Sequence, residues 1–474
     1  MAIITKSAAR LVSCATAALA LGGCAPSLRS HVSTVGTLSH VRQLPALREG
    51  HVEATTNNDV RTILREPMDA NAAVRIALLN NRELRAKLRE LGIVAGQVLQ
   101  AGLLANPLID LEFVPERDSK IEVRVEYDIT SLIMAPLRKQ AQQDDMEAAR
   151  LDAAGAVVQL GYDVRTTFYG LQATLQRLAL AQQSLDSLAA ARDAAAALLE
   201  AGNTAALESS SQIAAYERAR VNVAQLELEV AEHREEVQRM LGLYGEETQW
   251  QAKAGLPAVP DELAVADDIE RRAIEASLDL RASRKRLDGV AKRTGIARTG
   301  AWLPGVSADV HALQTKRVND TNRDQWIVSG GVSLVVPIFD RGQGRISGLE
   351  AQFDSLLERY QGLAVTTRSA ARDARNRLVS AHARARQYQR VILPAQTRVM
   401  QETVLQYNAM QLGVFQLLQA RRELLDVQLS YVDTLREYWS AIAEIEALTQ
   451  GRLVREAPSA GSAISAAYLE QGGH

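Results

Sequence analysis

Apolar side chains recur at alternating steps of three and four residues over a long stretch in the first half of the chain. The repeat runs through residues 160–199, and such a period is typical of a coiled-coil seam. No proline interrupts residues 137–201, so the pattern predicts one helix there, about 95 Å long at ~1.5 Å per residue. That helix is far longer than those of ordinary globular domains.

A return helix is predicted over residues 204–241, and it carries two apolar stripes. The first stripe comprises Val221, Ala224, Leu228 and Ala231, and the second comprises Val223, Leu226, Val230, Val237 and Leu241. A helix with two seams packs against neighbours on both sides, as a stave does in a cylinder. A similar pair of helices is predicted over residues 346–410 and 415–450, where Pro394 is expected to kink the first helix.

Short stretches of alternating residues precede each long helix. Residues 108–114 and 121–129 alternate between apolar and polar side chains in the first half, and residues 306–313 and 326–336 do so in the second. A period of two predicts β-strands. Strands of about ten residues with one apolar and one polar face suit a membrane barrel. A solvated hairpin on a soluble domain is the alternative, and the four strands alone do not decide between the two.

The order of segments indicates an internal duplication. Residues 77–86 match residues 273–282 at an offset of 196, and Gly202 matches Gly413 at an offset of 211. An offset that grows slowly through loop insertions is typical of a duplicated unit. Each repeat is predicted to contain a helix, a β-hairpin and a long helix pair, with the first helices over residues 69–102 and 266–298.

The N-terminus has the pattern of a bacterial lipoprotein signal peptide. Lys6 and Arg10 precede an apolar run over residues 11–21, and small residues lead into Cys24. The alternative is a transmembrane anchor, which needs about 20 apolar residues, more than this run provides. Cys24 is therefore the predicted lipidation site, and Ala25 after it fits delivery to the outer membrane. Two or three acyl chains would hold the mature protein stably at that membrane.

These patterns divide the chain into six segments. They are a signal peptide (1–23), a lipidated N-terminal arm (24–67), a first repeat (68–244), a linker (245–265), a second repeat (266–452) and a flexible C-terminal tail (453–474).

Composition and charge exclude several other classes of protein. The 474 residues carry a formal net charge of −2, which gives no reason to expect nucleic acid as a partner. Aromatic residues make up only 4% of the chain, which favours long helices packed at close range over a large enzyme core. Cys14 and Cys24 are the only cysteines, so the predicted mature protein has no disulfide.

No residue pattern indicates catalysis or a bound cofactor. The seven histidines show no metal-ligand spacing, and no glycine-rich phosphate loop follows a strand. The segment from Gly342 to Gly344 is interpreted as a strand-to-helix turn. Asp144 and Asp145 are expected on a solvated helix face. The sequence therefore predicts that the chain is not an enzyme and holds no metal or cofactor.

The order of lipid site, helix, hairpin and long helix pair resembles the TolC-type outer-membrane efflux family, specifically its lipidated members. The resemblance covers about residues 60–452. The segments that carry it are Ala77-Leu78, Asn80-Asn81, Asn106-Pro107, the strand from Gly331 to Pro337 with the following Ile338-Phe339-Asp340-Arg341-Gly342, Leu393-Pro394-Ala395, Leu412-Gly413 and Leu418-Gln419-Ala420.

This resemblance implies a mainly α-helical fold with a membrane β-barrel. Three copies of the chain would close a twelve-stranded barrel above a periplasmic α-helical barrel. The residue patterns agree, because four strands cannot close a barrel alone and an open sheet edge cannot lie in lipid. The implied location is the outer membrane, with the long helices extending into the periplasm.

The implied function is a passive exit duct that works with a periplasmic adaptor and an inner-membrane pump. The alternative is that the chain is itself a periplasmic adaptor lipoprotein with coiled-coil hairpins. An adaptor should have one helical hairpin flanked by compact β-domains, whereas this chain has two hairpins and two strand pairs. The lumen residues do not choose among drugs, metal cations, solvents and polypeptides as cargo.

The two turns between long helices, residues 201–206 and 411–415, are the predicted adaptor-docking tip. Gly202 and Gly413 are expected to make the reversals with positive φ. Leu412, Val414 and Phe415 leave more apolar surface near a turn than solubility requires. The alternative is that these side chains only pack between protomers.

The tunnel constriction is where the chain departs from the family. Family members often carry acidic residues just after the second turn, but this chain has Gln416 and Gln419, followed by Arg421 and Arg422. We name Gln416, Gln419 and Arg422 as candidate constriction residues. The alternative is that they only make interhelical hydrogen bonds.

Overall fold

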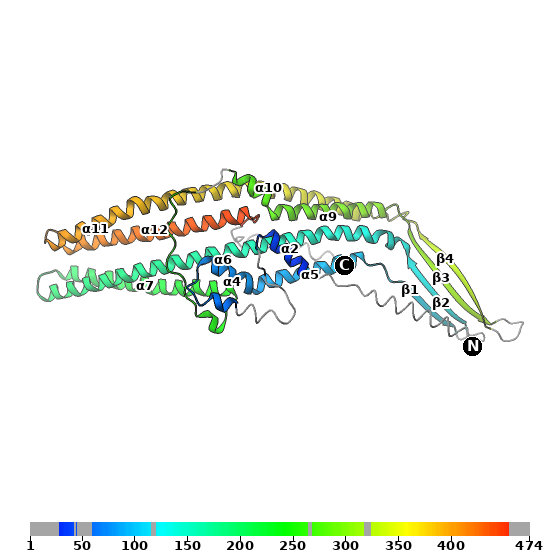
Figure 1. The fold of residues 1–474 in the computed structure, drawn as a ribbon, viewed down its shortest axis with the longest axis horizontal. Helices are drawn as coiled ribbons and strands as arrows, with labels where there is room; N and C mark the ends of the chain where they lie inside the picture. Colours follow the sequence, from blue (N-terminus) through cyan, green and yellow to red (C-terminus); the bar gives the residue numbers. More distant parts are fainter. Residues whose placement is uncertain are drawn as a thin grey trace. The chain divides into compact units, whose positions relative to one another are not determined.

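The computed structural model describes residues 28–41, 44, 59–114, 120–263, 268–316 and 324–454. The predicted signal peptide, Cys24 and most of the predicted tail lie outside these residues. The chain divides into two compact units: the first contains residues 1–31, 89–149 and 285–357, and the second contains residues 32–88, 150–284 and 358–474. Figure 1 labels the helices and strands of both units.

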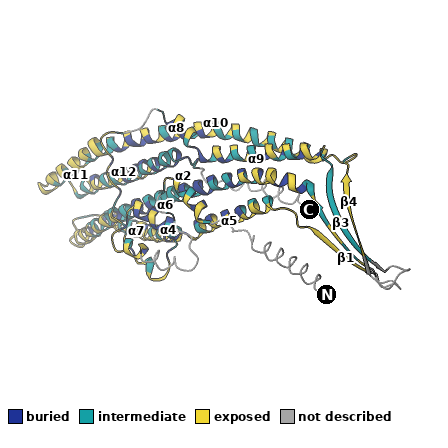
Figure 2. Cartoon of the chain, turned by 45° about the vertical axis from the view of Figure 1, so that its right-hand side comes forward, coloured by how far each residue is buried: buried dark blue, intermediate teal, exposed yellow. Residues whose placement is uncertain are grey.

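The first unit contains a four-stranded antiparallel sheet. Its strands are β1 (Leu108–Val114), β2 (Lys120–Asp128), β3 (Gly305–Lys316) and β4 (Asp324–Val335), and their order in the sheet follows the sequence. The four predicted strands are therefore confirmed. Strands β1 and β4 are the two edges, and both are coloured largely as exposed in Figure 2.

Each predicted first helix is in fact two helices separated by a single residue. They are α4 (Ala70–Asn80) with α5 (Arg82–Gly102), and α8 (Ile269–Ala276) with α9 (Leu278–Gly300). The intervening residues Asn81 and Ser277 have non-helical backbones, with ψ of 122° and 110°, and their side chains accept hydrogen bonds from the Leu84 and Leu280 amides. Such side-chain capping starts a new helix, which the apolar period does not reveal.

The long helices agree closely with the predicted ranges. Helix α6 (Ile129–Glu200) contains 72 residues and is followed by α7 (Ala206–Leu241). Helix α6 starts before its predicted first residue because Asp128, at the end of β2, accepts a hydrogen bond from the Ser131 amide and caps it.

The second copy of this helix pair is interrupted where Pro394 predicted a kink. Helix α10 (Gln343–Gln387) passes into a π-helical turn (Tyr388–Ile392) and continues as α11 (Leu393–Asn408) before α12 (Val414–Thr449). Pro394 lacks an amide hydrogen, and its ring displaces the carbonyl that precedes it by four residues. The wider π-turn immediately before Pro394 accommodates that change.

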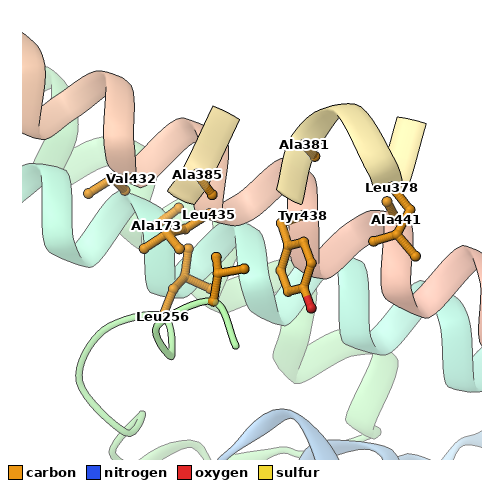
Figure 3. Packing of buried hydrophobic residues seen from close by; sticks show 10 residues of the cluster. Ala173, Leu256, Leu378, Ala381, Ala385, Val432, Leu435, Tyr438 and Ala441 are labelled. Carbon is orange, nitrogen blue, oxygen red and sulfur yellow. The ribbon is translucent and has the colours of Figure 1, made fainter. Parts of the chain in front are cut away.

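The core of the second unit joins the linker to three helices. Figure 3 shows Ala173 of α6 and Leu256 of the linker beside Val432 and Leu435 of α12, with Leu378 of α10 in the same cluster. Trp439 donates its indole N–H to the Pro257 carbonyl at 2.9 Å. The linker after the first repeat is thus bound along the helices.

An ion pair holds the linker at the π-turn. The Asp261 carboxylate accepts a hydrogen bond from the Arg390 guanidinium at 2.5 Å, and Arg386 lies 3.8 Å from the same oxygen. Hydrogen bonding and charge from Arg390, with a smaller contribution from Arg386, lower the pKa of the Asp261 carboxyl.

The two apolar stripes of α7 differ in burial. Val223, Leu226, Val237 and Leu241 of the second stripe are buried, and Val223 and Leu226 form a cluster with Ala181 of α6. Val221 and Leu228 of the first stripe are 66% and 60% exposed. One apolar stripe of this helix is therefore buried by other parts of the chain, and the other stripe is exposed.

Candidate functional site

The pairing register gives the sheet two chemically different faces. In antiparallel strands, paired residues project to the same face, so the register assigns every side chain. One face is almost entirely apolar: Ile109, Leu111, Phe113, Ile121, Val123, Val125, Tyr127, Val306, Ala308, Val310, Ala312, Trp326, Val328, Val332 and Leu334 lie on it. The opposite face carries Asp110, Glu112, Glu122, Arg124, Glu126, Asp128, Ser307, Asp309, His311, Ser329 and Ser333, together with the apolar Leu108, Leu313, Ile327 and Val335.

Like charges are paired across strands on the polar face. Glu112 is directly opposite Glu122, and Glu126 is directly opposite Asp309. Arg124 donates a hydrogen bond to Glu122 at 3.4 Å. Like charges directly opposite each other destabilise a sheet. Their repulsion is weaker in water, because water has a high dielectric constant. The pattern of a polar, water-filled face behind an apolar, lipid-facing one is that of a membrane β-barrel wall.

The two tip turns have the same backbone geometry. In the first, the Gly202 and Asn203 amides donate to the Leu199 and Leu198 carbonyls, and in the second the Met410 and Gln411 amides donate to the Tyr407 and Gln406 carbonyls. This pair of bonds is the Schellman motif, which requires a residue of positive φ. Gly202 fills that position with φ +70°, as predicted.

The prediction of positive φ at Gly413 is wrong. Gly413 has φ −81° and ψ 167° and precedes α12, whereas Met410 has φ +58°. Reversal of the chain occurs three residues earlier than expected, because the hydrogen bonds that end α11 fall at Met410. No glycine or asparagine marks that position, so no residue pattern pointed to Met410.

The tips present large apolar side chains. Met410 is 94% exposed and Leu207, in the first turn of α7, is 83% exposed. Phe415 is exposed, while Leu412 and Val414 are half-buried. Both turns lie at the same end of the second unit (Figure 1). The structure therefore adds Met410 and Leu207 to the apolar residues expected at the tip.

A groove beside the second tip brings the candidate constriction residues together. It has a volume of about 630 Å³ and is lined from α6, α7 and α12. Phe415, Gln416, Gln419 and Arg422 all line it, as does Arg421. These side chains surround one space although the chain places them on several faces of α12.

Two of the side chains that line this groove make hydrogen bonds within the chain. The Gln419 amide donates to the Glu423 carboxylate at 2.9 Å, and the Arg421 guanidinium donates to the Gln183 carbonyl of α6 at 3.4 Å. Arg218, Arg421 and Arg422 line the groove with one carboxylate, that of Glu423. The lining of this groove is thus basic, in contrast to the acidic polar face of the sheet.

The expected solvated face at Asp144 and Asp145 is wrong for Asp144. Asp144 is buried, and its carboxylate is ion-paired with Lys292 and lies 3.5 Å from the Lys285 ammonium. Asp145 pairs with Arg293 at 2.5 Å. These partners belong to α9, more than 100 residues away, so the local pattern around Asp144 could not indicate them.

The described residues contain neither a cluster of metal ligands nor a membrane-spanning helix. Among those residues, no three His, Cys, Asp or Glu side chains lie together as metal ligands would. Within the same part of the chain, every helix is too short or too polar to cross a membrane.

Comparison with known proteins shows which proteins the chain resembles in sequence and in fold. No family model matches the chain. The cobalt-zinc-cadmium resistance protein CzcC of Cupriavidus metallidurans is 25% identical over 390 residues, which span 80% of this chain and 89% of CzcC. The solved structure of CusC superposes with a TM-score of 0.65, at 17% identity, over 82% of this chain and 92% of CusC.

The outer-membrane channel of Campylobacter jejuni, CmeC, gives a TM-score of 0.63 at 17% identity, over 82% of this chain and 87% of CmeC. The chain has the fold of the solved outer-membrane channels. These similarities show the fold of an outer-membrane channel, and none of them supports the adaptor alternative.

Proposed function

We propose that three copies of this chain form one passive exit duct, which an adaptor connects to an inner-membrane pump. The observation that carries the proposal is the open four-stranded sheet with one apolar and one polar face. A sheet in lipid must pair all its backbone groups, and β1 and β4 are unpaired edges within one chain. Pairing of β4 with β1 of the next copy closes twelve strands after three copies.

The helical part gives independent support for this assembly. Val221 and Leu228 leave an apolar stripe on α7 without cover from the described residues of the same chain. A neighbouring copy would bury the stripe and complete the second seam. The channel has no catalytic role in this proposal; the pump supplies the free energy, and the duct only conducts.

We further propose divalent transition-metal cations as the cargo. The name of CzcC refers to cobalt, zinc and cadmium resistance. The polar face of the sheet carries six carboxylates, those of Asp110, Glu112, Glu122, Glu126, Asp128 and Asp309, against the positive charge of Arg124. A lumen of that sign raises the local concentration of cations and so favours their passage.

The remaining sequence-based assignments are part of the same proposal. Gly202, Leu412, Gly413, Val414 and Phe415 form the adaptor-docking tip, with Met410 and Leu207 added from the structure. Gln416, Gln419 and Arg422 narrow the periplasmic mouth. Cys24 carries the lipid, and the six segments have the boundaries proposed from the sequence.

Assembly and conduction are tested on the purified full-length protein. Gentle detergent extraction should yield a trimer by light scattering, and the trimer should insert into planar bilayers as a pore. Val221→Asp places a charge in the proposed interface and should shift the protein towards monomers. Asn222→Asp adds the same charge on another side of α7 and should leave the trimer intact. A stable wild-type monomer without conductance would refute the proposal.

The cargo is tested in cells. Loss of this channel should lower resistance to zinc, cobalt and cadmium salts more than resistance to an uncharged organic drug. Complementation with Phe415→Asp should fail to restore resistance while the trimer still reaches the outer membrane. Equal loss of resistance to the metal salts and to the drug would contradict the proposal of metal cations as cargo. It would not contradict the proposal that the chain forms a duct.

A further inference from the structure

Large apolar side chains are exposed where each of the four strands meets a helix. Leu104 precedes β1, Ile133 follows β2, Trp302 precedes β3, and Ile338 and Phe339 follow β4. Trp302 is 78% exposed and Phe339 is 89% exposed. These five residues, with Arg341, are called the strand-base collar. All of them belong to the first unit.

The turn that holds Phe339 and Arg341 is well ordered by hydrogen bonds. The Gly342 amide donates to the Asp340 carboxylate at 2.8 Å, and the Arg341 amide donates to the Gln343 side chain at 2.7 Å. The Gln343 side-chain amide in turn donates to the Phe339 carbonyl at 3.0 Å. A hydrogen-bonded turn therefore holds the Phe339 side chain in its exposed position.

The collar combines apolar surface with basic charge. The Arg341 guanidinium lies over the Trp302 ring, 5.5 Å from its centroid, a cation–π arrangement. Lys139 and Arg345 are also exposed, and among the described residues no ion pair engages Lys139, Arg341 or Arg345. The nearby carboxylate of Asp340 is used by the Gly342 amide of its own turn.

The position of the collar determines what covers it. It borders the end of the apolar sheet face nearest the helices, and that face contacts the hydrocarbon of the outer membrane. In the proposed duct the helices extend into the periplasm, so this end meets the inner leaflet, which consists of phospholipids. Tryptophan and basic side chains are characteristic of the headgroup level, where the ring stays in apolar surroundings and the charge reaches the phosphates.

We propose that the strand-base collar is a binding surface for anionic phospholipid headgroups of the inner leaflet. Trp302, Phe339 and Ile338 enter the acyl–headgroup boundary, and Arg341 binds the lipid phosphate. The inference rests on the proposed membrane barrel. It assigns a role to the Ile338–Gly342 segment that conduction itself does not require.

The test uses the full-length protein in detergent, titrated with brominated phosphatidylglycerol or brominated phosphatidylcholine while tryptophan fluorescence is recorded. The difference between wild type and Trp302→Phe isolates the Trp302 signal. Half-maximal quenching of that signal should need about fivefold less phosphatidylglycerol than phosphatidylcholine, the ratio expected from one basic residue at an anionic surface. Arg341→Gln should abolish that preference. Arg298→Gln is the matched control, because Arg298 is paired with Glu350 at 2.5 Å.

Two outcomes would overturn the inference. If neither lipid quenches Trp302, protein covers the collar, which would point to a second copy as its occupant. If both lipids quench it equally in the wild type, the collar contacts lipid without recognising its headgroup. Conductance of the same preparations separates these results from failure of the duct: a conducting trimer with either outcome refutes the collar alone.

Discussion

Gly242 lies directly against Asn80, so closely that a Cβ added to Gly242 would stand 2.9 Å from the Asn80 carbonyl oxygen. The Asn80 side-chain amide donates to the Leu241 and Gly242 carbonyls at 3.1 and 2.8 Å. The C-terminus of α7 is thereby fixed to the break between α4 and α5. Gly451 occupies the equivalent place in the second repeat, against the carbonyl oxygen of Ala276.

Substitution of this glycine tests the contact. Gly242→Ala should lower the free energy of unfolding by about 1–3 kcal/mol, since an L-residue is strained at φ +66° and its Cβ has no room. The thermal unfolding midpoint of the detergent-solubilised protein is the measurement. Gly362→Ala on α10, where a Cβ would meet nothing within 4 Å, should be neutral or stabilising by about 0.5–1 kcal/mol. Equal losses in both variants would contradict the argument.

Met410 is strained in a position that glycine would occupy without cost. Met410→Gly should raise the free energy of unfolding by about 1 kcal/mol, because the left-handed conformation disfavours a side chain. It should also impair export, because it removes the most exposed apolar side chain of the proposed docking tip. The unfolding midpoint and metal resistance in cells measure the two effects. Normal export by a stabilised Met410→Gly protein would exclude Met410 from docking.

The buried Asp144 carboxylate should contribute to stability through its two lysine partners. Asp144→Asn removes its charge and should cost about 1–2 kcal/mol, below the value for fully buried pairs because Lys285 and Lys292 remain partly in water. Asp193→Asn on the same helix is the control. Asp193 is exposed and pairs only with its neighbour Arg192 among the described residues, so its loss should change stability by less than about 0.5 kcal/mol.

Asp163 makes stability depend on pH in the opposite sense from most carboxylates. Burial raises the pKa of its carboxyl above 3.8, and the Gln159 hydrogen bond and the Arg452 charge oppose this only partly. The folded state therefore holds the proton more tightly than the unfolded state. This contribution is fully present below the unfolded pKa and is lost as the pH rises through the folded one.

Asp163→Asn should accordingly raise the unfolding midpoint at pH 7, because it removes a half-buried carboxyl whose charged form is penalised by burial. The asparagine side-chain oxygen can still accept the Gln159 hydrogen bond, present at 2.9 Å in the wild type. The gain should shrink when both proteins are compared at about pH 4, close to the ordinary aspartate pKa. A gain that is the same at both pH values would show that burial of the charge is not its cause.

Acylation of the N-terminus is tested at Cys24. Cys24→Ala should abolish incorporation of labelled palmitate and leave the signal peptide uncleaved, because the thiol is the site of lipid attachment in a lipoprotein signal. Cys14→Ala lies within the predicted signal peptide and should still be acylated. Labelling of the Cys24→Ala protein would contradict the lipoprotein assignment.

The long helices, the strands and their order along the chain could be predicted from the sequence, whereas the helix breaks at Asn81 and Ser277 could not. The long helices, the four strands and the duplication follow from periods of 3.5 and 2 and from repeated spacing, because these patterns record which side of each element is apolar. The kink near Pro394 followed in the same way, since proline acts on its own helix.

Features that depend on partners distant in the sequence became visible in the folded chain alone. Asp144 is buried because α9 brings Lys285 and Lys292 to it, and the positive φ falls on Met410 because the last hydrogen bonds of α11 end there. The two stripes of α7 look alike in sequence. Packing against α6 buries Val223 and Leu226 and leaves Val221 exposed, because the fold of one chain offers this helix a partner on one side only.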